Sequence, residues 1–342
     1  MQVQTKRISE LDFMRGFALL GIILTNIISM MQPPDLINQN QVNYLALIYY
    51  CVENKIFSIC SFLFGVGFYI FINNAKQKGL NANKLFLRRL FFLAIFGIIH
   101  QFLQPGEALF IYAIFGLFLI PFFYLNKYIN LVVGLVILIA FIYLNIKIIL
   151  PLPYFILGLA AGQFELFIHI KTKILTLVTA VSGILSLASW TVLFKVHQLI
   201  NNPMLVPHLS KKEADIFIQN RDIYDHLLII TSPFIAVFYV SLLLLLVRVD
   251  IIGKLLSPLR LYGRMALTNY IGQTLLIYVA ILIFGKHHVD FMNTFWICLV
   301  IYIIQFIFSS IWLKYFKYGP LEYIWRLGTY WKIFSIKKST SQ

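Results

Sequence analysis

Ten apolar stretches separated by short polar segments make up most of the chain. An α-helix needs about 20 mainly apolar residues to cross the hydrocarbon core of a bilayer. A transmembrane β-strand needs roughly 10 residues and alternates apolar with polar positions, which these stretches do not. We therefore predict an all-α protein, a polytopic integral membrane helix bundle with ten transmembrane helices. The predicted spans lie near residues 13–32, 56–74, 88–104, 107–125, 128–149, 152–170, 174–196, 226–247, 262–285 and 292–312.

Lysine and arginine gather in alternate segments between the spans. They occur in the N-terminal arm and in residues 76–89, 171–173, 248–264 and 314–338. Because basic loops are retained on the cytoplasmic side of a membrane, this distribution places both the N- and the C-terminus in the cytoplasm. Residues 313–342 follow the last span and are predicted to form a cytoplasmic interfacial tail.

The segments on the opposite side are different in kind. Residues 32–55 contain the apolar stretch 45–50, which is too short to span and favours a re-entrant or interfacial helix. Residues 104–107 form a tight turn. Residues 197–225 form the longest loop and carry many charges, so we predict an external lid there. Neither a repeat nor a soluble domain is visible, and residues 1–342 are predicted to form a single transmembrane domain.

The composition agrees with a membrane protein. The chain is 60% apolar and 12% charged, against about 45–50% and about 25% in soluble domains. The net charge of +15 comes from the basic loops, so it indicates topology and lipid headgroup contact, and no nucleic-acid binding is expected. Cys51, Cys60 and Cys298 have neither zinc nor redox spacing, so no metal is expected either.

An acidic and a basic residue open the first span. Asp12 and Arg15 are three positions apart, so they share a helix face and can pair. One interpretation is an ordinary helix start with a headgroup-binding arginine. The other is that Arg15 binds a phosphate-bearing donor through bidentate hydrogen bonds. Asn26, deeper in the same span, needs a partner inside the bilayer, either another helix or a substrate carbonyl.

A histidine and a glutamate flank the turn at 104–107. His100 lies in the third span and Glu107 at the start of the fourth, so the short turn brings both to the outer face. A carboxylate that orients an imidazole fixes its tautomer, as a general base requires. The alternative is that Glu107 caps the fourth span while His100 anchors the third at the interface.

The ninth span carries a polar stripe. Arg264 and Thr268 are four positions apart, as are Asn269 and Gln273, so these side chains form rows along the helix. This many hydrogen-bonding groups favours a binding surface. Small residues in the same segment favour close helix packing as the alternative.

The tail after the last span contains a second charged pair. Glu322 and Arg326 are four positions apart on a predicted short helix, with Trp325 and Tyr330 as aromatic anchors. An interfacial helix explains this pattern. A donor-binding role shared with Arg15 is the other interpretation.

Several of these motifs resemble the YeiB family of bacterial membrane proteins. They run in the family's order from residue 7 to about residue 330 and cover nearly the whole chain. The resemblance implies a multi-pass protein of the bacterial inner (plasma) membrane. The motifs are Arg7-x-x-x-Leu-Asp-Phe-Met-Arg-Gly-Phe17, Phe62-Leu-Phe-Gly-Val-Gly67, the turn from His100 to Tyr112, Gly263-Arg-Met-Ala-Leu-Thr-Asn-Tyr270, and Gly319-Pro-Leu-Glu322 with Trp325-Arg326.

This family is similar, more distantly, to the transmembrane acyltransferases that include heparan-glucosaminide acetyltransferase and envelope-glycan acetylases. That resemblance implies transfer of an acyl (acetyl) group from cytosolic acyl-CoA to an extracytoplasmic hydroxyl or amine. By it, Asp12, Arg15 and Asn26 match the first-span motif. The chain departs from the pattern in having no histidine just after the first span, so His100 would replace it. Glu107 stands where family members usually carry Asp.

The leading hypothesis is therefore an acyl-transfer site with acyl-CoA as the donor. His100, oriented by Glu107, would be the base, with the thioester near Asn26. The expected donor-binding residues are Asp12, Arg15, Arg264 and Arg326, and the expected substrate-binding residues are Tyr112, Thr268, Asn269 and Gln273.

Two other hypotheses stay open. The same polar core could bind or transport a small amphiphile such as a quinone, a lipid or a metabolite, or the chain could be an inert sensor or assembly partner. The expected partners are the lipid bilayer, a small-molecule or glycan acceptor and, as a further alternative, a second copy of the chain in a homodimer.

Overall fold

The computed structural model describes residues 8–34, 38–198, 200 and 210–338. Regular secondary structure in this part of the chain is helical, apart from one isolated antiparallel bridge between Phe316 and Lys337. The helices are α1 (Ser9–Met31), α2 (Gln39–Cys51), α3 (Lys55–Gln77), α4 (Ala82–Gln101), α5 (Leu109–Phe122), α6 (Lys127–Tyr143), α7 (Pro151–Gln163), α8 (Leu166–His169), α9 (Thr172–His197), α10 (Lys211–Val247), α11 (Asp250–Leu255), α12 (Ser257–Arg264), α13 (Ala266–Phe284), α14 (Phe291–Tyr315) and α15 (Pro320–Tyr330).

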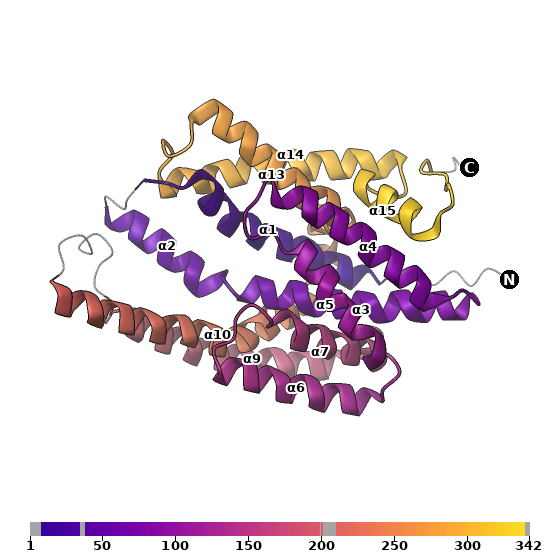
Figure 1. Ribbon diagram of the computed structural model, residues 1–342, viewed down its shortest axis with the longest axis horizontal. Helices are drawn as coiled ribbons and strands as arrows, with labels where there is room; N and C mark the ends of the chain where they lie inside the picture. The colour runs from indigo at the N-terminus through magenta and orange to yellow at the C-terminus, as the bar shows by residue number, and fades with distance from the viewer. Residues whose placement is uncertain (1–7, 35–37, 199, 201–209, 339–342) are drawn as a thin grey trace.

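The long helices lie side by side in an elongated bundle (Figure 1). In this view α13 and α14 lie along one side, α6 and α9 along the other, and α3 between them. The connection from α3 to α4 and the short helix α15 lie at the same end of the bundle. This is the arrangement that the predicted topology requires for its basic segments.

Six stretches of the described chain are long and apolar enough to cross a membrane. The protein is therefore a multi-pass membrane protein, and the predicted all-α polytopic bundle is confirmed. The count of ten spans stays a prediction, because α5 and α6 have only 14 and 17 residues. The six stretches are Ser9–Met31, Gln39–Gln77, Thr172–His197, Lys211–Val247, Ala266–Phe284 and Phe291–Tyr315.

Large apolar side chains cover the outside of the bundle. Ile139 of α6, Leu177 of α9, Leu282 of α13 and Ile303 of α14 are all exposed. Water would make such a surface unfavourable, whereas lipid tails solvate it. The surface therefore fits a bilayer as its surroundings.

Two segments differ from their predicted form. The apolar stretch 45–50 is part of a longer helix, α2, which leads through a short turn directly into α3. The predicted loop 197–225 is helical from Lys211 onward. The side chain of Ser210 caps that helix and Glu213 completes a capping box, which lets a charged sequence begin a helix.

Some predicted features lie outside the described residues. They are residues 199 and 201–209 of the expected lid, the first seven residues of the N-terminal arm and residues 339–342 of the tail.

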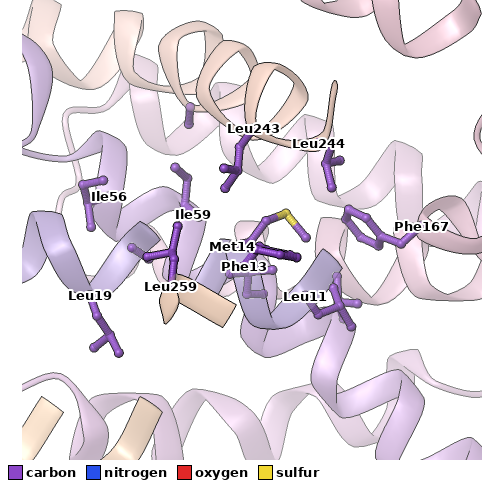
Figure 2. Packing of buried hydrophobic residues seen from close by; sticks show 14 of the residues in the cluster. Leu11, Phe13, Met14, Leu19, Ile56, Ile59, Phe167, Leu243, Leu244 and Leu259 are labelled. Carbon is purple, nitrogen blue, oxygen red and sulfur yellow. The ribbon is translucent and has the colours of Figure 1, made fainter. Parts of the chain in front are cut away.

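A buried apolar cluster holds α1 against α3, α10 and α12. Figure 2 shows Met14 of α1 among Ile59 of α3, Leu243 of α10 and Leu259 of α12. Each of these side chains is less than a tenth exposed. The cluster fixes the position of α1, which carries the first candidate site residues.

Two glycines allow α1 and α12 to cross closely. A Cβ atom on Gly263 would lie 1.9 Å from the carbonyl oxygen of Asp12, and one on Gly16 would lie 2.3 Å from that of Leu259. Only a residue without a side chain fits at either position. This crossing brings the start of α1, with Arg15, next to the end of α12, with Arg264.

Candidate functional site

Two neighbouring cavities lie inside the bundle. The outer cavity has a volume of about 670 Å³ and includes Asn26 and Gln104 in its wall. The inner cavity has a volume of about 410 Å³ and includes Arg15 and Arg326. Seven wall residues are common to both, so the two cavities adjoin one another. The shared residues are Leu19, Cys60, Phe64, Tyr112, Ala266, Leu267 and Trp325.

The inner cavity is strongly basic. Five basic side chains and one acidic side chain line it. Away from bulk water such an excess of charge attracts anions strongly. The six residues are Arg15, Arg89, Arg264, Lys317, Arg326 and Glu322.

Aromatic rings hold two of these arginines. The guanidinium of Arg89 lies 3.6 Å from the ring centre of Trp325. That of Arg326 lies 4.5 Å from the ring centre of Phe334 and 5.0 Å from that of Tyr330. A ring face attracts a cation without neutralising it as a carboxylate would. The arginines are thus positioned while the cavity stays positive.

The predicted pairing of Asp12 with Arg15 is present. Nη1 of Arg15 lies 3.3 Å from Oδ1 of Asp12. Arg15 lines the inner cavity, but Asp12 is buried and is not among the residues that line it. Asp12 therefore contacts the arginine, and its predicted direct contact with a donor has no support in this geometry.

Glu322 connects α15 to the start of α13. Its Oε1 accepts hydrogen bonds from the backbone amides of Leu267 (2.7 Å) and Thr268 (3.1 Å), and its Oε2 accepts one from the Thr268 hydroxyl (2.6 Å). Burial raises the pKa of Glu322 above its ordinary value. Thr268 is thus occupied by Glu322, and it is not among the residues lining either cavity.

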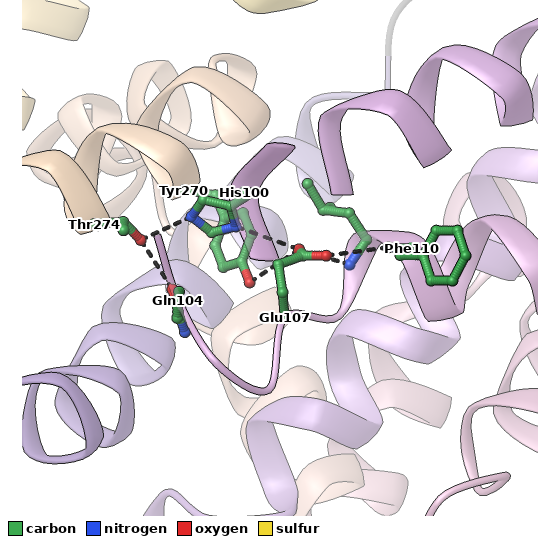
Figure 3. A network of polar contacts seen from close by, with 7 residues as sticks. His100, Gln104, Glu107, Phe110, Tyr270 and Thr274 are labelled. Atoms are coloured by element: carbon green, nitrogen blue, oxygen red, sulfur yellow. Dashed lines mark hydrogen bonds and ion pairs between the residues drawn. The ribbon is translucent and has the colours of Figure 1, made fainter. Parts of the chain in front are cut away.

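His100 lies in a polar network at the α4–α5 turn (Figure 3). Its Nε2 is 2.9 Å from Oγ1 of Thr274, and the Thr274 hydroxyl donates to Oε1 of Gln104 at 2.8 Å. Its Nδ1 faces Oε1 of Glu107 at 3.4 Å. The predicted contact between the imidazole and the carboxylate is therefore present.

Glu107 also caps α5, as the alternative interpretation predicted. Its carboxylate accepts hydrogen bonds from the backbone amides of Leu109 (2.7 Å) and Phe110 (3.1 Å). These bonds hold the Glu107 carboxylate at the N-terminus of α5, with Oε1 toward Nδ1 of His100.

The pair is set back from the cavities. His100 and Glu107 are 1% and 4% exposed, and neither is among the residues lining the outer or the inner cavity. Gln104 and Tyr270 line the outer cavity. Gln104 accepts a hydrogen bond from Thr274, which also contacts His100, and the Tyr270 ring packs edge-on against the imidazole. A bound molecule would meet these two residues before it met the imidazole, which differs from the predicted direct role of His100.

The polar stripe of α13 mostly joins helices. The amide of Asn269 donates to the carbonyl of Tyr262 and to Oγ of Ser309. That of Gln273 donates to the carbonyl of Leu19 and to the hydroxyl of Tyr262. Neither Asn269 nor Gln273 is among the cavity-lining residues. This geometry supports the packing alternative over substrate binding.

Four other predicted residues do line the cavities. Asn26 lines the outer cavity, Arg264 and Arg326 line the inner one, and Tyr112 lines both. The Tyr112 hydroxyl lies 2.7 Å from Oγ of Ser61. The sequence thus placed these four side chains along a common interior.

Sequence reasoning missed several residues of the site. Arg89 was assigned only to a basic loop, and Trp325 only to an interfacial anchor. Glu53, in the turn between α2 and α3, lines the outer cavity although it was assigned to an external loop. The available signal in the sequence was an acidic and a basic residue, Glu53 and Lys55, two positions apart between two apolar runs.

Comparison with known proteins places the chain in a family. A protein from Bacillus acidopullulyticus, described as "Uncharacterized 39.9 kDa protein in amylase 3'region", is 43% identical over 97% of this chain and 96% of its own length. Residues 185–332 match the family model "Protein of unknown function (DUF418)". The chain belongs to the YeiB-like DUF418 family.

Two further DUF418-type relatives agree with this assignment. "Uncharacterized protein YxaH" of Bacillus subtilis (strain 168) is 24% identical over 98% of this chain and 97% of its own. "Uncharacterized protein YeiB" of Escherichia coli (strain K12) is 35% identical over 98 residues, 28% of this chain and 26% of its own. No solved structure matches. The DUF418 match includes α12 and α15 and thus Arg264, Glu322, Trp325 and Arg326.

Proposed function

We propose that this DUF418 protein is a membrane-embedded acyltransferase. It takes an acyl (acetyl) group from cytosolic acyl-CoA and passes it to an extracytoplasmic hydroxyl or amine. Because the relatives are bacterial, we place it in the bacterial plasma membrane. The more distant resemblance to transmembrane acyltransferases belongs to this proposal.

The observation that carries the proposal is the pair of adjoining cavities, which share part of their walls. The inner cavity offers a cluster of arginines at the predicted cytoplasmic end, which suits the nucleotide diphosphate of CoA. The shared wall is largely apolar and includes Leu19 and Phe64, which suits the pantetheine arm and the acyl group. The outer cavity then meets the polar residues Asn26 and Gln104.

The His100–Glu107 pair enters this proposal as a positioning group. It reaches the outer cavity through Gln104 and Tyr270, which it holds in place. His100 therefore acts on the reaction through those two side chains, without touching the acceptor.

A binding experiment tests the donor site. The full-length protein in lipid nanodiscs is titrated with acetyl-CoA and, separately, with acetylpantetheine, which lacks the nucleotide. Binding of acetyl-CoA should be clearly tighter. Arg89→Gln should weaken it on the order of 10-fold through loss of a charge-assisted contact. Arg88→Gln is the matched control, because Arg88 is the neighbour of Arg89 but is not among the residues lining the inner cavity.

Two results would contradict the donor site. One is equal binding of acetyl-CoA and acetylpantetheine. The other is an equal effect of the Arg89→Gln and Arg88→Gln substitutions.

One observation favours a second candidate function. His100 and Glu107 are set back from the cavity wall, as they would be in a protein that binds or transports an anionic amphiphile without chemistry. Binding of acetyl-CoA without any release of free CoA thiol would favour this candidate over the acyltransferase.

A further inference from the structure

The long apolar segment that contains α2 and α3 is a broken helix. Residues 39–77 together are long enough to cross a membrane, but residues 52–54 interrupt the helix between α2 and α3. Asn54 has a φ of 61°, in the left-handed region that residues with a side chain rarely adopt. The amide of Lys55 donates to the carbonyl of Glu53 at 2.7 Å. The backbone therefore departs from regular helical geometry at these residues.

Side chains from three helices cap the end of α2. Unpaired backbone carbonyls are costly inside a membrane protein, and here three consecutive carbonyls each accept a hydrogen bond from a side chain. Hydrogen bonds from other parts of the fold therefore stabilise the break. The donors and acceptors are Lys55 of α3 with Tyr49 (2.9 Å), Trp190 of α9 with Tyr50 (3.2 Å), and Tyr239 of α10 with Cys51 (3.0 Å).

The break faces the outer cavity. Glu53 and Asn54 line it together with Asn26 of α1 and Lys147 from the α6–α7 connection. Among the described residues in this wall, Glu53 has the one carboxylate and Lys147 the one ammonium group. Glu53 therefore lies at the surface of the cavity, whereas His100 and Glu107 lie behind the cavity wall.

Charged groups from three elements surround Glu53. Lys55 at the start of α3, Lys147 before α7, and Arg221 and Asp225 of α10 all interact with it electrostatically. Lys147 also lies 3.6 Å from Asp225. Broken helices in membrane proteins commonly bind polar substrates, because their exposed backbone and nearby charges replace the hydration of a ligand.

We propose that the α2–α3 break is the acceptor site and that Glu53 is the catalytic carboxylate that contacts the acceptor. This inference rests on the proposed acyl transfer. A hydroxyl or amine of a small polar acceptor donates its hydrogen bond to Glu53.

In the transfer step a new bond joins the acceptor oxygen or nitrogen to the acyl carbon of the thioester. The acceptor's proton passes to the Glu53 carboxylate, and the C–S bond breaks. The CoA thiolate leaves with the bonding electron pair and takes up the proton that Glu53 accepted, which restores the carboxylate. Atoms and charge balance without any other reactant.

The test measures donor binding and thiol release in parallel. Full-length protein in nanodiscs is incubated with acetyl-CoA and with glucosamine as the probe acceptor, and free CoA thiol is followed over a range of pH. Glu53→Gln should leave acetyl-CoA affinity within about twofold. It should lower glucosamine-dependent thiol release on the order of 100-fold, as loss of a general base does.

Two further variants separate catalysis from folding. Glu53→Asp keeps a carboxylate and should restore part of the rate with a displaced pH profile. Glu165→Gln removes an exposed carboxylate that lines neither cavity, and it should stay close to the unmodified rate.

The outcomes are distinguishable. If the unmodified protein binds acetyl-CoA but Glu53→Gln releases thiol at the same rate, the role of Glu53 is overturned. Absence of glucosamine-dependent release from a protein that binds acetyl-CoA overturns it as well. Failure to bind acetyl-CoA overturns the proposed function itself.

Discussion

Arg89 and Trp325 hold each other in two ways. The guanidinium of Arg89 lies 3.6 Å from the ring centre of Trp325, and the indole nitrogen of Trp325 donates to the backbone carbonyl of Arg89 at 2.8 Å. These contacts join α4 to α15 at the wall of the inner cavity. Arg89, which the sequence assigned to a basic loop, is therefore held in α4 with its positive charge at the cavity wall.

Removing the ring should weaken anion binding. Trp325→Leu loses both the cation–π contact and the indole hydrogen bond, so acetyl-CoA affinity should fall about fivefold, the equivalent of about 1 kcal/mol. Trp325→Phe keeps a ring face and should have a smaller effect. Equilibrium binding in nanodiscs measures both variants, and equal affinities for Leu and Phe would argue against the ring's role.

The crossing of α1 and α12 should not tolerate a methyl group at its centre. In Gly263→Ala the new Cβ would meet the Asp12 carbonyl oxygen at 1.9 Å, so the helices must separate. The free energy of unfolding should fall by about 1–3 kcal/mol, as for other overpacked interiors.

Gly67→Ala is the control for this crossing. Its Cβ would come no closer than 3.5 Å to another group, Nη2 of Arg15, which is an ordinary contact. Denaturant unfolding in detergent compares the two variants. Similar losses of stability in both would contradict the account of the crossing.

The hydroxyl of Thr274 should stabilise the His100 network. Thr274→Val keeps the shape but leaves Nε2 of His100 and Oε1 of Gln104 without their partner. Buried polar groups that lose a partner cost about 1–3 kcal/mol. Thr274→Ser keeps the hydroxyl and should lose much less. A Val variant as stable as the Ser variant in thermal unfolding would show that the network contributes little.

Glu322 should give stability a distinct pH dependence. Burial raises its pKa above the ordinary value of 4.5, so the folded protein favours the protonated form more than the unfolded chain does. The contribution of this carboxyl to stability is therefore fully present below pH 4.5 and is lost as pH rises through the higher folded value.

Glu322→Gln isolates that contribution because glutamine does not titrate. The stability of the unmodified protein relative to this variant should decline as pH rises from acid towards neutral. Melting temperatures of both proteins across that range make the comparison. A relative stability that increases with pH would reverse the sign and contradict the raised pKa.

Much of the fold was predictable because long apolar stretches have few alternatives in a bilayer. Each predicted span overlaps helical structure, as α1 and α14 illustrate, although the spans at 152–170 and 262–285 are each divided between two helices. The start of α10 was missed because residues 211–225 are charged, and a capping box rather than apolar character begins that helix. The break after α2 was missed because side chains from distant helices, such as Trp190, support it.

The candidate site was predictable only in part. Arg15, Arg264 and Arg326 line one cavity. This was predictable because a charged side chain close to an apolar span is costly unless it faces a polar cavity or a partner. Asn269 and Gln273 look equally functional in the sequence, but their partners lie on other helices. A polar residue can contact either a neighbouring helix or a cavity, and the way the helices cross decides which. The periodicity of the sequence does not show how the helices cross.

Cys60 offers the most direct test of the central claim, because it lines both cavities where they meet. In a variant that keeps Cys60 but carries Cys51→Ser and Cys298→Ser, the rate of modification by a small methanethiosulfonate reagent is measured with and without acetyl-CoA. If the donor's thioester arm enters from the inner cavity, acetyl-CoA should slow modification several-fold, and Arg89→Gln should reduce that protection. Modification at the same rate with saturating acetyl-CoA would contradict a donor path through the bundle.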